Sequence, residues 1–156
     1  MKPSSILLLI FCCIAFSSQA GNGIIHLTDS NYAVIPYTKS ESYLFKNAKA
    51  TSLCKAEIQG IETLLNKCID EHNKEVNSKP IKWGAIEDIG YKVQLIPVTN
   101  NKGEKEVWIN CFCESVFSDF WRKGIIRVCD GGSCYFNLKI NLTTQKFYNL
   151  MINGEA

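Results

Sequence analysis

The stretch that decides the fold is residues 54–76, which read CKAEIQGIETLLNKCIDEHNKEV. Positions spaced three or four residues apart in this stretch are apolar or weakly polar, namely Cys54, Ile58, Ile61, Leu65, Cys68, His72 and Val76. That period places them on one face of an α-helix, and charged residues occupy the rest of its surface. Thr51 or Ser52 can cap the start of the helix, and Asn77-Ser78 followed by Pro80 ends it.

The residues after this helix predict the surface on which its apolar stripe packs. Residues 91–95 and 107–113 alternate between apolar and polar on either side of the turn Asn100-Asn101-Lys102-Gly103, which is typical of an antiparallel hairpin. The alternation puts Val107, Ile109, Cys111 and Cys113 on one face of the second strand.

Further short elements complete the predicted sheet. We expect residues 125–129 to pair with residues 134–140 through a Gly-Gly turn, and residues 147–152 to form a last strand. The weaker expectations are two short strands at 23–27 and 32–37 and a helical turn at 116–121. The predicted fold class is α+β, with one long amphipathic helix packed on a curved antiparallel sheet of four to five strands.

Composition limits the classes of protein to which the chain can belong. It has 156 residues, 46% of them hydrophobic, and a formal net charge of +2. The ample apolar content argues against disorder, and the small charge argues against a nucleic-acid-binding protein. We expect a monomer with a single core.

The first twenty residues have the pattern of a secretory signal peptide. Lys2 gives a basic start, Ile6 to Phe16 form an apolar run, and Ser18-Gln19-Ala20 resembles a cleavage site. The run is shorter than the roughly 20 residues that a membrane-spanning helix needs. We therefore expect residues 1–20 to be a signal peptide and residues 21–156 to be one secreted, extracellular domain without a membrane anchor.

Six cysteines lie beyond the signal peptide, and an even set in an oxidising compartment predicts disulfide bonds. They are Cys54, Cys68, Cys111, Cys113, Cys129 and Cys134. The turn Asp130-Gly131-Gly132-Ser133 predicts that Cys129 and Cys134 meet and bond. The spacings lack the usual paired C-x2-C pattern of zinc sites, so we expect no metal.

The other four cysteines leave several pairings open. Cys54 and Cys68 would lie ~21 Å apart along one helix, too far to bond to each other. Cys111 and Cys113 point to the same face of one strand, ~7 Å apart, which makes them natural partners for the helix cysteines. Because the two separations do not match, either Cys54 precedes the helix or sits in a loosened first turn, or one of the four bonds to a cysteine of the Gly-Gly turn.

The sequence offers few residues for catalysis. Its histidines are His26, in a weak strand, and His72, on the helix stripe, and no motif joins either one to a nucleophile. We expect no catalytic residue and no cofactor, with a small hydrolase or nuclease as the least favoured alternative. Asn141-Leu142-Thr143 is an N-glycosylation sequence on the expected outward face of a strand end.

The run Asp70-Glu71-His72-Asn73-Lys74 at the helix end resembles the D-E-H-N-K run of plant-type cystatins. The strand at 90–95 is similar to the G-x-x-Y-x-L strand of that family, and the resemblance covers roughly residues 54–98. It implies a cystatin-like fold and the inhibition of papain-like cysteine proteases by a wedge. In the family this wedge comprises an N-terminal glycine, a Q-x-V-x-G hairpin and a later tryptophan hairpin.

Only parts of the wedge pattern are present in this chain. Gly90 matches the last hairpin position, but Ile86 stands in place of Gln and Asp88 in place of Val. Gly23 is the candidate N-terminal glycine, and Trp121 follows Phe120 where the family has a Pro-Trp pair. The binding residues that the resemblance implies are Gly23, Glu87, Asp88, Ile89, Gly90 and Trp121.

Two functions follow as hypotheses. The first is a secreted binding protein of cystatin-like architecture whose protein partner is a papain-like cysteine protease. The second is a secreted interaction protein, or a binder of small apolar ligands, on the same scaffold and without protease inhibition. For the small ligand, Trp108 and Phe112 lie opposite the cysteine face of their strand.

Overall fold

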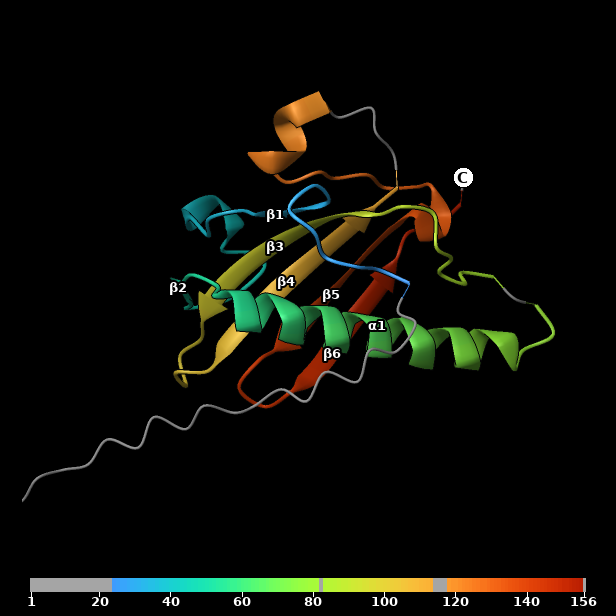
Figure 1. Cartoon of the computed structure of the whole chain (residues 1–156), viewed down its shortest axis with the longest axis horizontal. Helices are drawn as coiled ribbons and strands as arrows, with labels where there is room; N and C mark the ends of the chain where they lie inside the picture. Colours follow the sequence, from blue (N-terminus) through green and yellow to red (C-terminus); the bar gives the residue numbers. More distant parts are fainter. Residues whose placement is uncertain (1–23, 82, 114–117, 156) are drawn as a thin grey trace, which may run out of the picture.

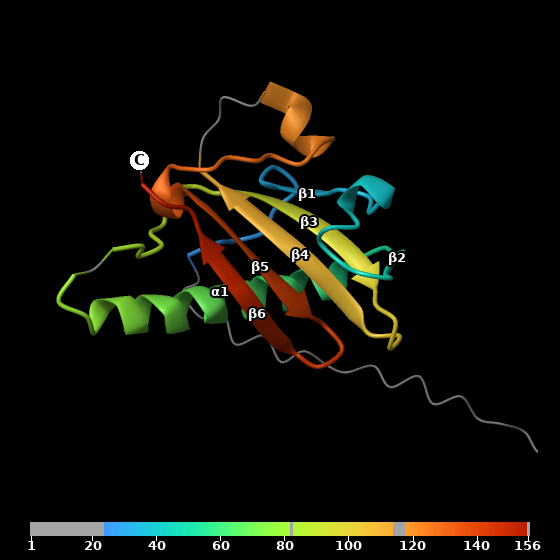
Figure 2. The same cartoon turned by 180° about the vertical axis from the view of Figure 1, so that it is seen from behind.

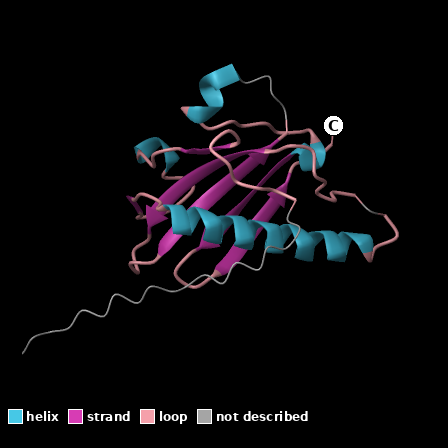
Figure 3. Cartoon of the chain, in the orientation of Figure 1, coloured by secondary structure: helices cyan, strands magenta, loops and turns pink. Residues whose placement is uncertain are grey.

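One helix crosses a six-stranded, mostly antiparallel sheet, and this arrangement confirms the predicted α+β class (Figures 1 and 3). The structure is a computed structural model that describes residues 24–81, 83–113 and 118–155. The strands lie in the order β1–β3–β4–β5–β6, with β2 also paired to β3. The elements are β1 (Tyr32–Val34), β2 (Lys49–Ala50), α1 (Lys55–Asn77), β3 (Lys92–Thr99), β4 (Lys105–Phe112), β5 (Tyr135–Asn141) and β6 (Lys146–Ile152), with short 3-10 turns at Lys39–Glu41, Ser118–Arg122 and Gly132–Cys134.

The helix begins at Lys55, and its cap lies two to three residues later than the predicted one. Its N-cap is Cys54 and not Thr51 or Ser52, because the carboxylate of Glu57 accepts a hydrogen bond from the Cys54 backbone N–H at 2.8 Å. This carboxylate also binds the amino group of Lys105 on β4 at 2.6 Å. The cap is therefore set by a contact with the sheet. The helix ends at Asn77, as predicted.

The apolar stripe of α1 packs on one face of the sheet and forms the main core. Alternate residues of the three central strands point toward the helix, in agreement with the predicted alternation. The fully covered side chains of this core include Ile61, Leu65, Val93, Leu95, Val107, Ile109, Cys111, Leu138 and Ile140. Within the described residues, no helix is long and apolar enough to cross a membrane.

The hairpin predicted between the first two long strands is confirmed. β3 and β4 pair antiparallel with Leu95 opposite Ile109, and the chain reverses over residues 100–103. Gly103 has a φ of +79°, which glycine adopts without steric cost. The Asn100 backbone closes the turn by accepting from the Gly103 N–H at 3.0 Å.

The predicted pairing of residues 125–129 with residues 134–140 is wrong. β5 lies between β4 on one side and β6 on the other, so both of its hydrogen-bonding edges are occupied. Residues 125–129 have no strand partner and run as an irregular segment over the sheet.

The N-terminal part of the described chain also differs from the prediction. β1 is a strand, but it pairs parallel to β3. Residues 24–27 form no strand, because side chains of α1 bind their backbone. Asn66 accepts from the Ile25 N–H at 2.9 Å and donates to the Ile25 carbonyl at 2.7 Å. β2, which was not predicted, pairs antiparallel with the end of β3.

A second apolar cluster covers the sheet face opposite α1, the face turned toward the viewer in Figure 2. Side chains of the sheet pack there against residues 33–48 and 121–135, and the cluster includes Ile96, Val98, Trp108, Phe112, Phe45, Trp121 and Ile126. The predicted helix-on-sheet arrangement is therefore only one half of the domain. Two irregular segments supply the other half.

Candidate functional site

Three segments meet at one end of the sheet, and we call this surface the hairpin end. It consists of residues 46–52 around β2, the β3–β4 turn at residues 100–103, and the β5–β6 turn at residues 142–145 (Figure 1). In an antiparallel meander the first and third turns lie at the same end, because each strand reverses direction. Pairing of Lys49 with Thr99 brings β2 to the same end.

Hydrogen bonds hold the three segments in fixed relative positions. The Lys105 backbone N–H donates to the Thr143 hydroxyl at 2.9 Å, and the Leu142 N–H donates to the Lys105 carbonyl at 2.9 Å. The Lys105 amino group donates to the Ser52 carbonyl at 3.1 Å and to Glu57 on α1 at 2.6 Å. One lysine therefore ties both turns to the segment that leads into the helix.

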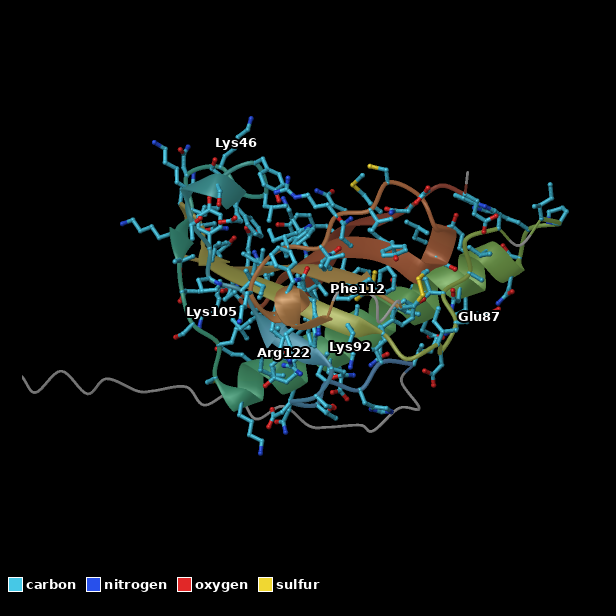
Figure 4. All side chains as sticks on the ribbon, turned by 90° about the horizontal axis from the view of Figure 1, so that it is seen from above. Lys46, Glu87, Lys92, Lys105, Phe112 and Arg122 are labelled. Atoms are coloured by element: carbon cyan, nitrogen blue, oxygen red, sulfur yellow. A yellow bond between two sulfur atoms is a disulfide. The ribbon has the colours of Figure 1, made fainter. Side chains whose placement is uncertain are left out.

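The exposed charge of the hairpin end is positive. Lys46, Lys49, Lys102 and Lys146 are exposed there. The nearby Glu104 and Glu106 are only half-exposed, and each accepts a hydrogen bond from the Asn141 amide. Hydrogen bonds from Asn100 and Asn141 lower the pKa of Glu104. Figure 4 places Lys46 and Lys105 at one end of the molecule and Glu87 at the other.

The Asn141 side chain is buried and engaged. Its amide nitrogen donates to Glu104 at 3.0 Å and to Glu106 at 3.2 Å, and its oxygen accepts from the Thr144 N–H at 2.9 Å. A glycan on this nitrogen would replace one of its two hydrogen atoms, so the nitrogen could not keep its bonds to both carboxylates. Asn141 is not the exposed outward residue that we expected, and its glycosylation stays a prediction.

The structure does not bring together the binding residues implied by the cystatin resemblance. Glu87, Asp88, Ile89 and Gly90 are exposed in the loop from α1 to β3, at the end of the sheet opposite the hairpin end. Trp121 is only 6% exposed and packs edge-on against Phe112 in the second cluster. Gly23 lies outside the described residues.

The two turns of the hairpin end could have been found from the order of strands and turns in the sequence.

The residues that carry the resemblance hold this connecting loop in place. His72 Nε2 donates to the Gly84 carbonyl at 2.9 Å. Asn73 bonds to both backbone groups of Ile86, accepting from its N–H at 2.8 Å and donating to its carbonyl at 2.7 Å. Ile81 and Trp83, on the same loop, are 80% and 53% exposed. The loop therefore has a fixed base and exposed apolar side chains.

The disulfide differs from the predicted one, because Cys134 bonds to Cys113 and not to Cys129. Cys113 follows β4 directly and Cys134 precedes β5, so strand pairing sets their Cα atoms 5.1 Å apart. Cys129 lies in the irregular segment and remains exposed. Asn153 fixes that segment by donating to the Val128 carbonyl at 2.7 Å.

Three further cysteines are free thiols in the structure. Cys54 is exposed at the helix start, before the first turn, and neither it nor Cys68 bonds to a cysteine of β4 as we expected. The bond of Cys113 to Cys134 is the other alternative left open by the spacing. Cys68 and Cys111 are buried in the main core. Burial raises the pKa of Cys68 to about 11 and that of Cys111 well above its ordinary value, so both remain protonated thiols at neutral pH.

The two histidines do not form a joint site. His72 is engaged by the connecting loop, and the exposed His26 lies 3.3 Å from the carboxylate of the half-buried Glu62 on α1. Across residues 24–81, 83–113 and 118–155, no group of three or more His, Cys, Asp or Glu is placed to hold a metal ion.

The pair proposed for a small apolar ligand is split by the second cluster. Phe112 is only 1% exposed, beneath the irregular segments, and offers no surface. Trp108 is 8% exposed and lines a cavity.

Comparison of the chain with known protein families, curated proteins and solved structures finds no match.

Proposed function

We propose that this protein is a secreted binding protein of cystatin-like architecture whose contact surface is the hairpin end, and that it inhibits papain-like cysteine proteases. The observation that carries the proposal is the meeting of a short N-terminal strand and two hairpin turns at one end of a helix-covered sheet. These elements correspond in kind to the wedge of the family that the sequence resembles. The residues of these elements differ from the binding residues that the sequence resemblance implied.

Rigidity of the hairpin end supports this use. The links from Lys105 to Thr143, Ser52 and Glu57 fix the segments before any partner binds. A surface that is already ordered loses little conformational entropy on association, which favours binding. The exposed tips, Asn101-Lys102 and Thr143-Thr144, are free to enter a cleft.

The test is the rate of papain hydrolysis of a small substrate in the presence of the purified protein. We expect inhibition at micromolar protein concentration. Lys102→Glu and Thr144→Glu, one in each turn, should each weaken inhibition by about tenfold, because a carboxylate must be desolvated in the contact. Lys123→Glu, also an exposed residue but away from the hairpin end, is the matched control and should inhibit as the wild type does.

Two results would count against the proposal. One is the absence of papain inhibition at micromolar concentration. The other is an equal loss in the Lys123 control, which would show that net charge and not the turns determines inhibition.

A second candidate function is partner binding through the connecting loop, without protease inhibition. The exposed Ile81, Trp83 and Ile89 favour it, since exposed apolar and aromatic side chains on a fixed loop are typical anchors of protein contacts. In this case a protein partner bound by the wild type should be lost with Ile81→Ser plus Trp83→Ser. It should be retained with Met151→Ser, which removes an equally exposed apolar side chain from β6.

A further inference from the structure

A cavity of about 140 Å³ opens on the sheet face opposite α1, and none of its lining residues belongs to the hairpin end. Trp108 lies at its base with 8% of the residue exposed, and Tyr43 lies at its rim with 57% exposed. Residues 125–128 of the irregular segment form one wall. The volume is below the range of drug-sized pockets, so the cavity suits a ligand of about one ring.

The charge of the lining is purely positive. Arg127 lines the cavity, and the described residues of the lining include no Asp, Glu or Lys. Its guanidinium lies 4.7 Å from the centre of the Tyr43 ring and donates one hydrogen bond, to the Tyr43 hydroxyl at 2.7 Å. The other N–H groups of this guanidinium have no partner among the described residues, so they can donate to an anion.

Asn137 supplies a second donor beside the indole. Its side-chain oxygen accepts from Trp108 Nε1 at 3.3 Å, which directs its amide nitrogen away from that bond. This nitrogen has no partner in the part of the chain that the structure describes. The other amides of the lining are engaged, since Asn110 donates to Gln94 and Ile126, and Asn153 donates to Val128 and Asp130.

We propose that this cavity binds a small aromatic carboxylate. The ring lies against the indole of Trp108, and the carboxylate accepts hydrogen bonds from Arg127 and from the Asn137 amide. Among the described residues of the lining, the aromatic base and a cation with no acidic group beside it together select this class over a neutral or cationic ring. The cavity shares no residue with the hairpin end. A measurement of papain inhibition therefore does not test ligand binding in the cavity.

Calorimetric titration of the purified protein with benzoate tests the proposal. We expect one site with a dissociation constant of about 1 mM or lower, a value within reach of a ligand of this size. Benzamide, which has the same shape without the charge, should bind about tenfold more weakly, because hydrogen bonds to charged groups are the stronger ones. Equal binding of benzoate and benzamide would overturn the carboxylate assignment.

Two variants and a matched control locate the site. Arg127→Gln should weaken benzoate binding about tenfold by removing the charge. Asn137→Asp keeps the acceptor for Trp108 but sets a carboxylate beside the ligand, and should abolish binding. Arg122→Gln removes another exposed arginine stacked on an aromatic ring, 4.3 Å from Trp121 and outside the cavity, and should leave binding unchanged.

The thermal midpoint of each variant shows whether it is folded. Benzoate binding that is absent in the wild type, or that is unchanged in both folded cavity variants, would overturn the site.

Discussion

Replacing Gln94 by methionine should detach residues 121–126 from the sheet. Gln94 is fully buried in β3, directly opposite Asn110 of β4. Its amide nitrogen donates to the carbonyls of Trp121 and Gly124 at 2.6 Å and 2.7 Å. Its oxygen accepts from the Ile126 N–H and from Asn110, both at 3.0 Å. Methionine has a similar length and volume but makes none of these bonds.

The expected loss of stability follows from the groups left without a partner. Three backbone groups of residues 121–126 lose a buried hydrogen bond, at about 1–3 kcal/mol each. The more apolar side chain recovers about 1–2 kcal/mol. We therefore expect Gln94→Met to lower the free energy of unfolding by about 4 kcal/mol, a large share of the stability of a domain of this size.

Urea unfolding followed by tryptophan fluorescence measures this loss, and hydrogen exchange of the Ile126 amide locates it. Gln59→Met is the matched control, because Gln59 is exposed on α1 and makes no such contacts. We expect the control to change stability by less than about 0.5 kcal/mol. A loss below about 1 kcal/mol in Gln94→Met, with unchanged exchange at Ile126, would refute the role of this side chain.

Three further outcomes are expected. Changing both Cys113 and Cys134 to serine should cost about 3 kcal/mol in urea unfolding, since the bridge spans a sequence separation of 21 residues, and reductant should cause a similar loss in the wild type alone. Burial raises the pKa of Glu57, but its bonds to Lys105 and to the backbone outweigh this effect and lower it. Its contribution to stability is therefore present above its ordinary pKa and lost as the pH falls through the lowered one, so Glu57→Gln should flatten the acid limb of a stability-against-pH curve. Asn73→Ala removes two hydrogen bonds to the connecting loop and should speed proteolytic cleavage in that loop at unchanged helix content.

The part of the site that could be predicted from sequence is the pair of turns. Asn100-Asn101-Lys102-Gly103 indicated the first turn directly, and the second follows from the strand at 147–152. The predicted binding residues were placed elsewhere because the likeness to the cystatin motif was local. Gly90 matches one motif position, but it lies where the chain enters β3 and not in a hairpin turn.

The disulfide shows where local reasoning reaches its limit. A Gly-Gly turn between Cys129 and Cys134 predicts a bridge across the turn, and Gly131 and Gly132 do have positive φ values. The bond nevertheless forms to Cys113, 21 residues away in the sequence. Pairing of β4 with β5 determines which sulfur atoms meet, and that pairing is a long-range property.

The sequence by itself determined the helix and the central strands. Their apolar periods of about 3.6 and 2 residues are local patterns, and each one specifies the face that must be buried. Only the tertiary structure decided what covers the other face of the sheet. Residues 33–48 and 121–135 have no regular period. Gln94 and Asn110 hold the second of these segments, through backbone partners that lie 16 to 32 residues away along the chain. Such a buried polar network has no local signature, because each of its bonds exists only once both the strands and the segment are in place.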